Sequence, residues 1–249
     1  MKQSVLFNKL LFLISVPKCV HCSSKLDYGD KALCKSCLVI YEQENTRDCS
    51  RCSKKLSFCN CSNFFLENHL VKNLIKVFRY SMKEEPTRGN SLIYSLKRDY
   101  RYDVIEFLSD QLCSAILHNY SLDNSFIVTS VPRRKESIIK YGYNHSEELA
   151  RAVSKKLNIS YIRILQSKAK YAQKNLTKEQ RFENANFTYI KKHPPNLKGM
   201  NVLIVDDIVT TGSSMAASAK LIKKLGAKKI LGATLAIAYK DSYTPFVKG

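Results

Sequence analysis

The stretch of residues 202–214, VLIVDDIVTTGSS, decides the fold. Its four leading apolar residues are rich in β-branched side chains and predict a fully buried strand. Asp206 and Asp207 follow at the carboxyl end of that strand, and a hydroxyl- and glycine-bearing turn leads into an alanine-rich helix over residues 215–225. Open parallel sheets bind ligands at the carboxyl ends of their strands, where the next helix offers unpaired N–H groups and the positive end of its dipole. The turn suits a phosphate and the carboxylates suit sugar hydroxyls, so a ribose 5-phosphate fits both.

The order of residues in this stretch is more restrictive than an acidic strand end alone. Any parallel strand can end in carboxylates, and any helix can be capped by Ser or Thr. Two carboxylates, two apolar residues, Thr-Thr-Gly and two serines together resemble the phosphoribosyl pyrophosphate (PRPP) motif of type I phosphoribosyltransferases. The resemblance implies that PRPP is bound by Asp206, Asp207, Thr210, Thr211, Gly212, Ser213 and Ser214.

The composition is that of a globular chain with a strong excess of positive charge. The 249 residues suffice for one ordinary domain and a small appendage, and 45% of them are hydrophobic. Lys and Arg number 41 against 21 Asp and Glu, which gives a net charge of +20. This excess favours a polyanionic partner: nucleic acid, a membrane surface or phosphorylated small molecules. The alternative is a lysine-rich chain whose charges are merely solvated.

Eight of the nine cysteines occur as close pairs before residue 62. Zinc prefers four tetrahedral thiolates, and a C-x-x-C turn supplies two of them. The spacing predicts one zinc set of Cys19, Cys22, Cys34 and Cys37, and a second, less regular set of Cys49, Cys52, Cys59 and Cys61. A cross-braced pairing of the turns stays open. The competing interpretation is a disulfide framework, which is typical of secreted chains.

The expected role of this zinc is structural, because four thiolates leave no open coordination position. We interpret His21 as a bystander within the first turn, and Cys113 as a small buried hydrophobe of a helix. Residues 5–16 are apolar but shorter than the ~20 residues of a membrane span, and they lack a cleavage site typical of signal peptides. They predict an amphipathic helix packed on the cysteine module, with peripheral membrane contact as the alternative.

The rest of the chain alternates helices and strands. Residues 64–120 show helical patterns with basic patches, and the apolar spacing over 91–116 predicts one or two helices. Strands are expected at 126–131, 161–165 and 230–239, and a helix at 145–157. Arg133, Arg134 and Lys135 follow the 126–131 strand, where a crevice at the sheet edge suits pyrophosphate. The fold class is therefore α/β, a parallel sheet flanked by helices behind a cysteine-rich module.

A basic segment over residues 166–198 interleaves aromatic rings with positive charges. Charge suits the backbone of single-stranded nucleic acid and rings suit its bases. The residues assigned to such binding are Lys168, Lys170, Lys174, Lys178 and Arg181. The alternative is an ordinary basic insertion anchored to the core by its aromatic residues.

Taken together, these features resemble the ComF family, phosphoribosyltransferase-like proteins associated with DNA uptake in naturally competent bacteria. The resemblance rests on the cysteine turns, on the Val-Pro step and basic loop at 131–135, on the pattern QxxL…EQRxxNxxF over 173–187, and on the PRPP motif. It implies a zinc-binding module at 1–63 and a type I phosphoribosyltransferase-like domain at 64–249, with a basic hood at 166–198. It also implies PRPP bound with Mg²⁺, and structural Zn²⁺.

One segment departs from the family pattern. The family typically has Arg-Gly-Phe-Asn-Gln where this chain has YGYNH over residues 141–145. The loss of that arginine removes a fixed cation, for which Lys140 is the neighbouring substitute. The departure bears more on catalysis than on PRPP binding.

Three functions are compatible with the sequence. The first is a competence protein that binds PRPP and single-stranded DNA and works with the DNA-uptake machinery, in the cytoplasm or peripherally at the inner face of the membrane. The second is a metabolic phosphoribosyltransferase in which a nucleophile displaces pyrophosphate at the anomeric carbon. The third is a non-catalytic scaffold that senses PRPP. The cysteine module and the charge favour the first or third.

Overall fold

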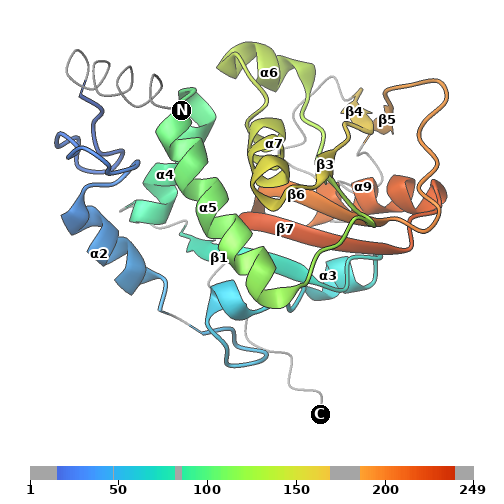
Figure 1. The fold of residues 1–249 in the computed structure, drawn as a ribbon, viewed down its shortest axis with the longest axis horizontal. Coiled ribbons are helices and arrows are strands. Elements are labelled where there is room, and N and C mark those ends of the chain that lie inside the picture. Colours follow the sequence, from blue (N-terminus) through green and yellow to red (C-terminus); the bar gives the residue numbers. More distant parts are fainter. Residues whose placement is uncertain (1–15, 47, 82–85, 169–185, 239–249) are drawn as a thin grey trace.

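The computed structural model describes residues 16–46, 48–81, 86–168 and 186–238 (Figure 1). At its centre lies a five-stranded parallel sheet in the order β1-β7-β6-β2-β3. The strands are β1 Leu74–Tyr80, β2 Phe126–Ser130, β3 Ser160–Tyr161, β6 Asn201–Val209 and β7 Lys229–Ala238. A separate antiparallel hairpin joins β4 Leu165–Ser167 to β5 Phe187–Tyr189. The predicted parallel sheet flanked by helices is confirmed.

Helices cover both faces of the sheet. The longer ones are α4 Arg88–Arg98, α5 Tyr102–Asn119, α7 His145–Leu157 and α9 Ser213–Lys224, and the short α6 spans Lys135–Tyr141. Side chains alternate along the central strand, as a sheet buried on both faces requires. Leu203 and Val205 join the core beneath α5 and α7, whereas Val202 and Ile204 join the core beneath α9. The residues at the carboxyl end of this strand are therefore held in place by packing on both faces of the sheet.

The cysteine-rich segment packs against this frame. It contains α2 Lys35–Glu44, a 3₁₀ turn, η1 Leu56–Phe58, and the short helix α3 Phe64–Glu67. Leu33 and Tyr41 belong to the core of the α5 and α7 face, and Leu56 and Leu66 belong to the core of the α9 face. The cysteine-rich segment thus contributes side chains to the cores on both faces of the sheet.

The structure agrees with most of the predicted elements and differs in three places. Helices α4, α5, α7 and α9 and strands β2 and β7 lie where the apolar spacing predicts them. The helical interpretation of residues 64–120 is wrong at 74–80, where β1 forms the edge of the sheet. The central strand continues through the Asp pair to Val209 instead of ending before it. The expected strand at 161–165 is divided between the end of β3 and the start of β4.

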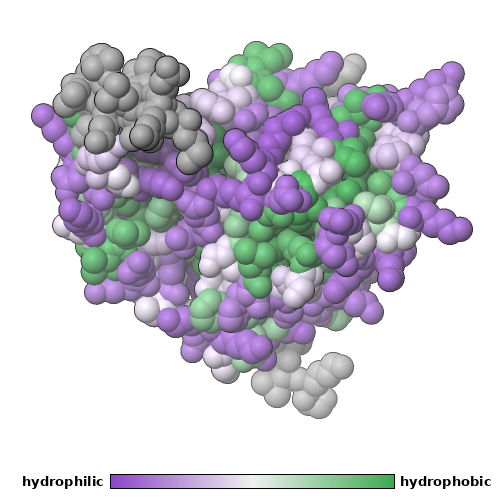
Figure 2. All heavy atoms as spheres, viewed as in Figure 1, coloured by the Kyte–Doolittle hydropathy of each residue, from purple (hydrophilic) through white to green (hydrophobic). Residues whose placement is uncertain are grey.

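The surface is largely hydrophilic on the face seen in Figure 2, with an apolar patch over α6. Ile139 of that helix is 80% exposed. Across the described ranges, no helix is both long enough and apolar enough to cross a membrane.

Candidate functional site

Asp206 and Asp207 lie near the carboxyl end of β6, with only 6% and 0% of their surfaces exposed. The guanidinium of Arg133, just beyond β2, bridges them: its Nη2 lies 3.2 Å from Oδ1 of Asp206 and also donates to Oδ1 of Asp207. Ser146, in the first turn of α7, donates to the same Asp206 oxygen at 3.1 Å and accepts a hydrogen bond from Nε of Arg133 at 3.1 Å. Three elements thus meet at the acidic pair.

Two further nitrogen atoms approach the second carboxylate. Nζ of Lys97, in α4, lies 3.1 Å from Oδ2 of Asp207, and Nε2 of His145 lies 3.4 Å from the same oxygen. From β7, the Thr234 hydroxyl donates to the main-chain carbonyl of Asp207 at 3.1 Å. Buried carboxylates require such partners, because desolvated charge is costly without them.

This environment separates the acidities of the two carboxyl groups. Burial, reinforced by the charge of Asp207 and opposed by Arg133, raises the pKa of Asp206 to about 7. Burial also disfavours ionised Asp207, but the charges of Arg133 and Lys97 prevail and hold its pKa well below the usual range. Burial lowers the pKa of His145, which keeps its ring neutral at pH 7. Asp207 is therefore ionised at neutral pH, whereas Asp206 gains or loses its proton near pH 7.

The turn after β6 carries the predicted phosphate-binding residues. Gly212 has a φ of 87° and forms the N-cap of α9. The hydroxyls of Thr211 and Ser213 lie 2.8 Å apart, while Thr210 and Ser214 are exposed. The first turn of α9 contains no acidic residue, so its positive dipole end favours an anion.

The turn over residues 210–214 packs on α3, which directly follows the second cysteine group. A Cβ atom at Gly212 would lie 2.5 Å from Cγ of Leu66, a fully buried residue. Nδ2 of Asn63 donates to the main-chain carbonyl of Thr211 at 3.3 Å, and its Oδ1 accepts from the N–H of Leu66 at 2.8 Å. Both the positive φ and this close approach require glycine.

The remaining predicted contacts are placed less centrally. Arg134 is the N-cap of α6 and Lys135 is its exposed first residue, so Arg133 is the member of the basic loop that reaches the acidic pair. Lys168 is exposed just after β4. The other residues assigned to nucleic acid lie outside the described residues: Lys170, Lys174, Lys178 and Arg181.

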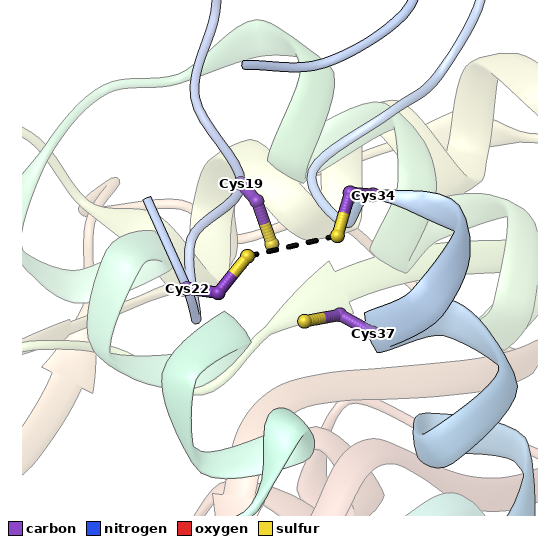
Figure 3. Close-up of side chains that lie close together, drawn as sticks. All are labelled: Cys19, Cys22, Cys34 and Cys37. Atoms are coloured by element: carbon purple, nitrogen blue, oxygen red, sulfur yellow. Dashed lines mark hydrogen bonds between the residues drawn. The ribbon is translucent and has the colours of Figure 1, made fainter. Parts of the chain in front are cut away.

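The first cysteine group comes together as the spacing predicts. Figure 3 shows Cys19 and Cys22 on a loop and Cys34 and Cys37 at the start of α2, with their sulfur atoms turned toward one another. All four sulfur atoms lie within 4.8 Å of one another, and those of Cys22 and Cys34 are 3.6 Å apart. That separation far exceeds the ~2.05 Å of a disulfide. It is close to the edge of about 3.8 Å of a tetrahedron with Zn–S bonds of about 2.3 Å.

The second group has the same character. The sulfur atoms of Cys49, Cys52, Cys59 and Cys61 also lie within 4.8 Å of one another. The two groups are separate in the structure, and their first turns repeat: the N–H of Cys19 donates to Ser24 and that of Cys49 to Lys54, each at 2.8 Å. Each group can therefore hold one metal ion through four thiolates. Cys113 stays buried in α5, and burial raises its pKa to about 12.

Several residues of the site carry no signal in the sequence. Lys97 lies in a mixed-charge segment that resembles an ordinary solvated face, and its contact depends on where α4 packs. Asn63 contacts the turn over residues 210–214 from a position almost 150 residues earlier in the chain. His145 is the exception among these residues. It is the last residue of the 141–145 segment, whose departure from the family pattern is a signal in the sequence.

Comparison with known proteins agrees with this geometry. Residues 143–248 match the family model described as the phosphoribosyl transferase domain. Competence protein F of Haemophilus influenzae is 24% identical over 223 residues, which cover 86% of this chain and 93% of that protein. DNA utilization protein YhgH of Escherichia coli is 25% identical over 226 residues, which cover 88% of this chain and 96% of that protein. The chain is thus similar over most of its length to competence-related proteins, and it contains a match to the phosphoribosyl transferase domain.

A further relative matches a short segment of the chain. Ribose-phosphate pyrophosphokinase of Thermococcus kodakarensis is 56% identical over 45 residues, which cover 17% of this chain and 16% of that protein. The chain thus combines a phosphoribosyl transferase domain with two cysteine groups that can bind metal. It is a phosphoribosyltransferase-like homologue of competence-related proteins.

Proposed function

We propose that the protein binds PRPP at the end of β6 and single-stranded DNA on its basic surface, and that it serves DNA uptake. The observation that carries the PRPP assignment is the buried acidic pair beside the N-terminus of α9. Asp206 and Asp207 provide acceptors for the ribose hydroxyls, and residues 210–214 provide hydroxyls, N–H groups and a positive dipole for the 5-phosphate.

Arg133 has a double role in this proposal. Without ligand it neutralises the acidic pair, to which it donates hydrogen bonds. The diphosphate of PRPP is a stronger partner for a guanidinium, because it offers two oxygens to the planar fork. PRPP therefore draws Arg133 toward the diphosphate and frees carboxylate oxygens for the sugar.

Mg²⁺ fits the same place on chemical grounds. It prefers oxygen ligands and is usually held by one or two carboxylates together with substrate phosphates. Asp206 and Asp207 are the buried carboxylates beside the phosphate turn. Bound Mg²⁺ supplies charge neutralisation to the diphosphate.

Calorimetric titration with PRPP and Mg²⁺ tests the site. Asp206→Asn combined with Asp207→Asn keeps the shape of both side chains and is expected to abolish binding. The matched control is Glu42→Gln, which removes an exposed carboxylate on α2. Unchanged affinity in the double variant would refute the assignment, provided that its far-UV spectrum matches the wild type.

The proposal for single-stranded DNA rests on the net charge of +20 and on the basic, aromatic composition of residues 166–198. Such binding weakens steeply with salt, with a slope of about 0.7 per phosphate contact. Changing Lys168, Lys170, Lys174, Lys178 and Arg181 to Gln is expected to reduce that slope. The matched control changes five exposed lysines elsewhere to Gln: Lys54, Lys72, Lys155, Lys224 and Lys228. If the salt slope of DNA binding fell equally in both variants, the general positive charge of the protein, and not residues 166–198, would account for the binding.

A role in DNA uptake places the protein in the cytoplasm, next to the membrane where DNA enters, and DNA-uptake proteins are its expected partners. Crosslinking in competent cells during uptake tests this placement. Recovery of the protein away from the membrane under those conditions would contradict it.

The second candidate function is transfer of ribose 5-phosphate to an acceptor. The intact acidic pair favours it, and the Tyr141-to-His145 segment, which lacks the arginine of the family pattern, weighs against it. A pyrophosphate-release assay with a panel of nucleobase acceptors separates the two functions. Release that depends on an acceptor and is lost in Asp207→Asn would establish the enzyme; PRPP binding without release would favour a binding or sensing role.

A further inference from the structure

Lys76 is a lysine in the middle of the edge strand β1, and only 3% of its surface is exposed. Its Nζ atom points into the second cysteine group, where it lies 3.1 Å from Sγ of Cys59. The same ammonium donates to the main-chain carbonyl of Cys61 at 2.7 Å and to that of Leu74 at 3.2 Å. The carbonyl of Cys59 lies at 3.5 Å.

A buried ammonium requires negative charge nearby, because desolvation of an isolated charge is prohibitive. Within the described part of the chain, no carboxylate forms an ion pair with Lys76. Its partners are neutral carbonyl groups and one sulfur atom. The missing negative charge must therefore come from the cysteine group.

We propose that Lys76 is the counter-ion of a divalent metal centre formed by the second cysteine group. The proposal rests on the metal site described above and adds a residue to it. Four thiolates carry four negative charges and a divalent ion returns two positive ones, so the centre keeps a net charge of about two negatives. The ammonium offsets part of that charge and orients Cys59 through its hydrogen bond. A disulfide at Cys59 would leave the ammonium facing a neutral sulfur.

The first cysteine group provides an internal contrast. Cys22 of that group is exposed, and its sulfur contacts the hydroxyl of Ser24 at 3.2 Å. Water can solvate the negative charge of that centre directly. Each group has two buried cysteines, Cys19 and Cys37 at 2% and 5% exposure and Cys49 and Cys59 at 4% and 1%. The difference is that the first group also has an exposed cysteine, Cys22, whereas Cys52 and Cys61 of the second group are half-buried. Metal binding by the second group should therefore depend on a nearby lysine, and metal binding by the first group should not.

Metal release from the full-length protein tests the proposal. Lys76→Met removes the charge and keeps most of the volume, and Lys72→Met is the matched control at an exposed position two residues before β1. In the wild type we expect two zinc ions per chain, released by a chelator in two phases. In Lys76→Met one phase should accelerate at least about tenfold, as expected when a residue supporting a metal ligand is removed. The other phase and the Lys72→Met variant should stay unchanged.

A spectroscopic measurement separates a counter-ion from a residue that only fills space. Cobalt(II) in thiolate sites shows a sulfur-to-metal charge-transfer band whose energy rises when a cation stabilises the thiolate. In Lys76→Met this band should move to longer wavelength for one of the two cobalt ions, in a protein with unchanged far-UV circular dichroism. Identical bands and identical release rates in wild type and Lys76→Met would overturn the proposal. A wild-type protein without bound metal would instead refute the metal site itself.

Discussion

The Nζ atom of Lys97 lies 3.1 Å from Oδ2 of Asp207, so α4 reaches directly into the acidic pair. The other end of this helix is attached to the first cysteine group. Arg88 pairs with Glu44 of α2 at 3.0 Å, and Ser91 contacts Nδ1 of His21 at 2.9 Å. His21, expected to be a bystander, thus links the first cysteine turn to the helix that carries Lys97.

Replacing Lys97 with Met should weaken the site without disrupting the fold. The change leaves one oxygen of Asp207 with fewer partners, and we expect a loss of about 1–3 kcal/mol in the free energy of unfolding. PRPP affinity should fall as well, since Asp207 loses part of the field that keeps it ionised. Urea unfolding and calorimetry check both effects. Arg98→Met, at the exposed neighbouring position, should change neither; equal effects in the two variants would contradict the contact.

Gly212→Ala should be far more harmful than Gly199→Ala. Both glycines have positive φ, 87° and 81°, so each alanine costs about 1–2 kcal/mol in the backbone. A Cβ at Gly199 meets nothing within 4 Å, whereas one at Gly212 would meet Leu66 at 2.5 Å. Thermal unfolding should show the larger loss for Gly212→Ala, and PRPP binding should fail only in that variant. Similar losses of both would mean that the contact with α3 is unimportant.

PRPP affinity should rise with pH through about 7. Burial, together with the charge of Asp207, raises the pKa of Asp206 to about 7, so this carboxyl is protonated in more acidic solution and accepts hydrogen bonds fully only above that value. The 5-phosphate also ionises, with a second pKa near 6. In the Asp206→Asn variant, ionisation of the phosphate still contributes to the pH dependence of PRPP affinity, whereas the carboxyl group no longer does. Isothermal titration from about pH 6 to about pH 8 should therefore give a steeper profile for the wild type. Parallel profiles would exclude Asp206 as the titrating group.

The two cysteine groups should bind metal independently. Cys37→Ser is expected to remove one zinc ion per chain, Cys61→Ser the other, and Cys113→Ala neither. Cys113 belongs to neither group, and its burial raises its pKa to about 12. Elemental analysis of the purified variants gives the counts. Loss of both ions from either single variant would indicate a shared centre.

Periodicity accounted for the interior of the fold. Strand β6 and helices α7 and α9 follow from apolar spacing because both faces of the sheet are buried. The edge strand β1 escapes the periodicity argument for a physical reason: Lys76 and Arg79 interrupt its apolar residues. One of these two charges, Lys76, reaches the second cysteine group.

The candidate site was predictable where its residues are close in sequence. The 206–214 segment and the C-x-x-C turns bring their own neighbours together, so a local pattern suffices. Lys97, Asn63 and Leu66 reach the site only through packing between distant segments, which no local pattern reveals. The family pattern marked residue 145 as unusual but gave no indication that it lies beside Asp207.

The strand order has a consequence for synthesis of the chain. Strands β1 and β2 emerge early, but their neighbours β7 and β6 are translated last. Until then, β1 has no partner in the main sheet, and its apolar residues stay open to water and to other chains. Both cysteine groups lie before β1 and can take metal while the ribosome is still making the sheet. The carboxyl end of β6, with its acidic pair, is thus completed late, against a cysteine-rich segment that has already been synthesised.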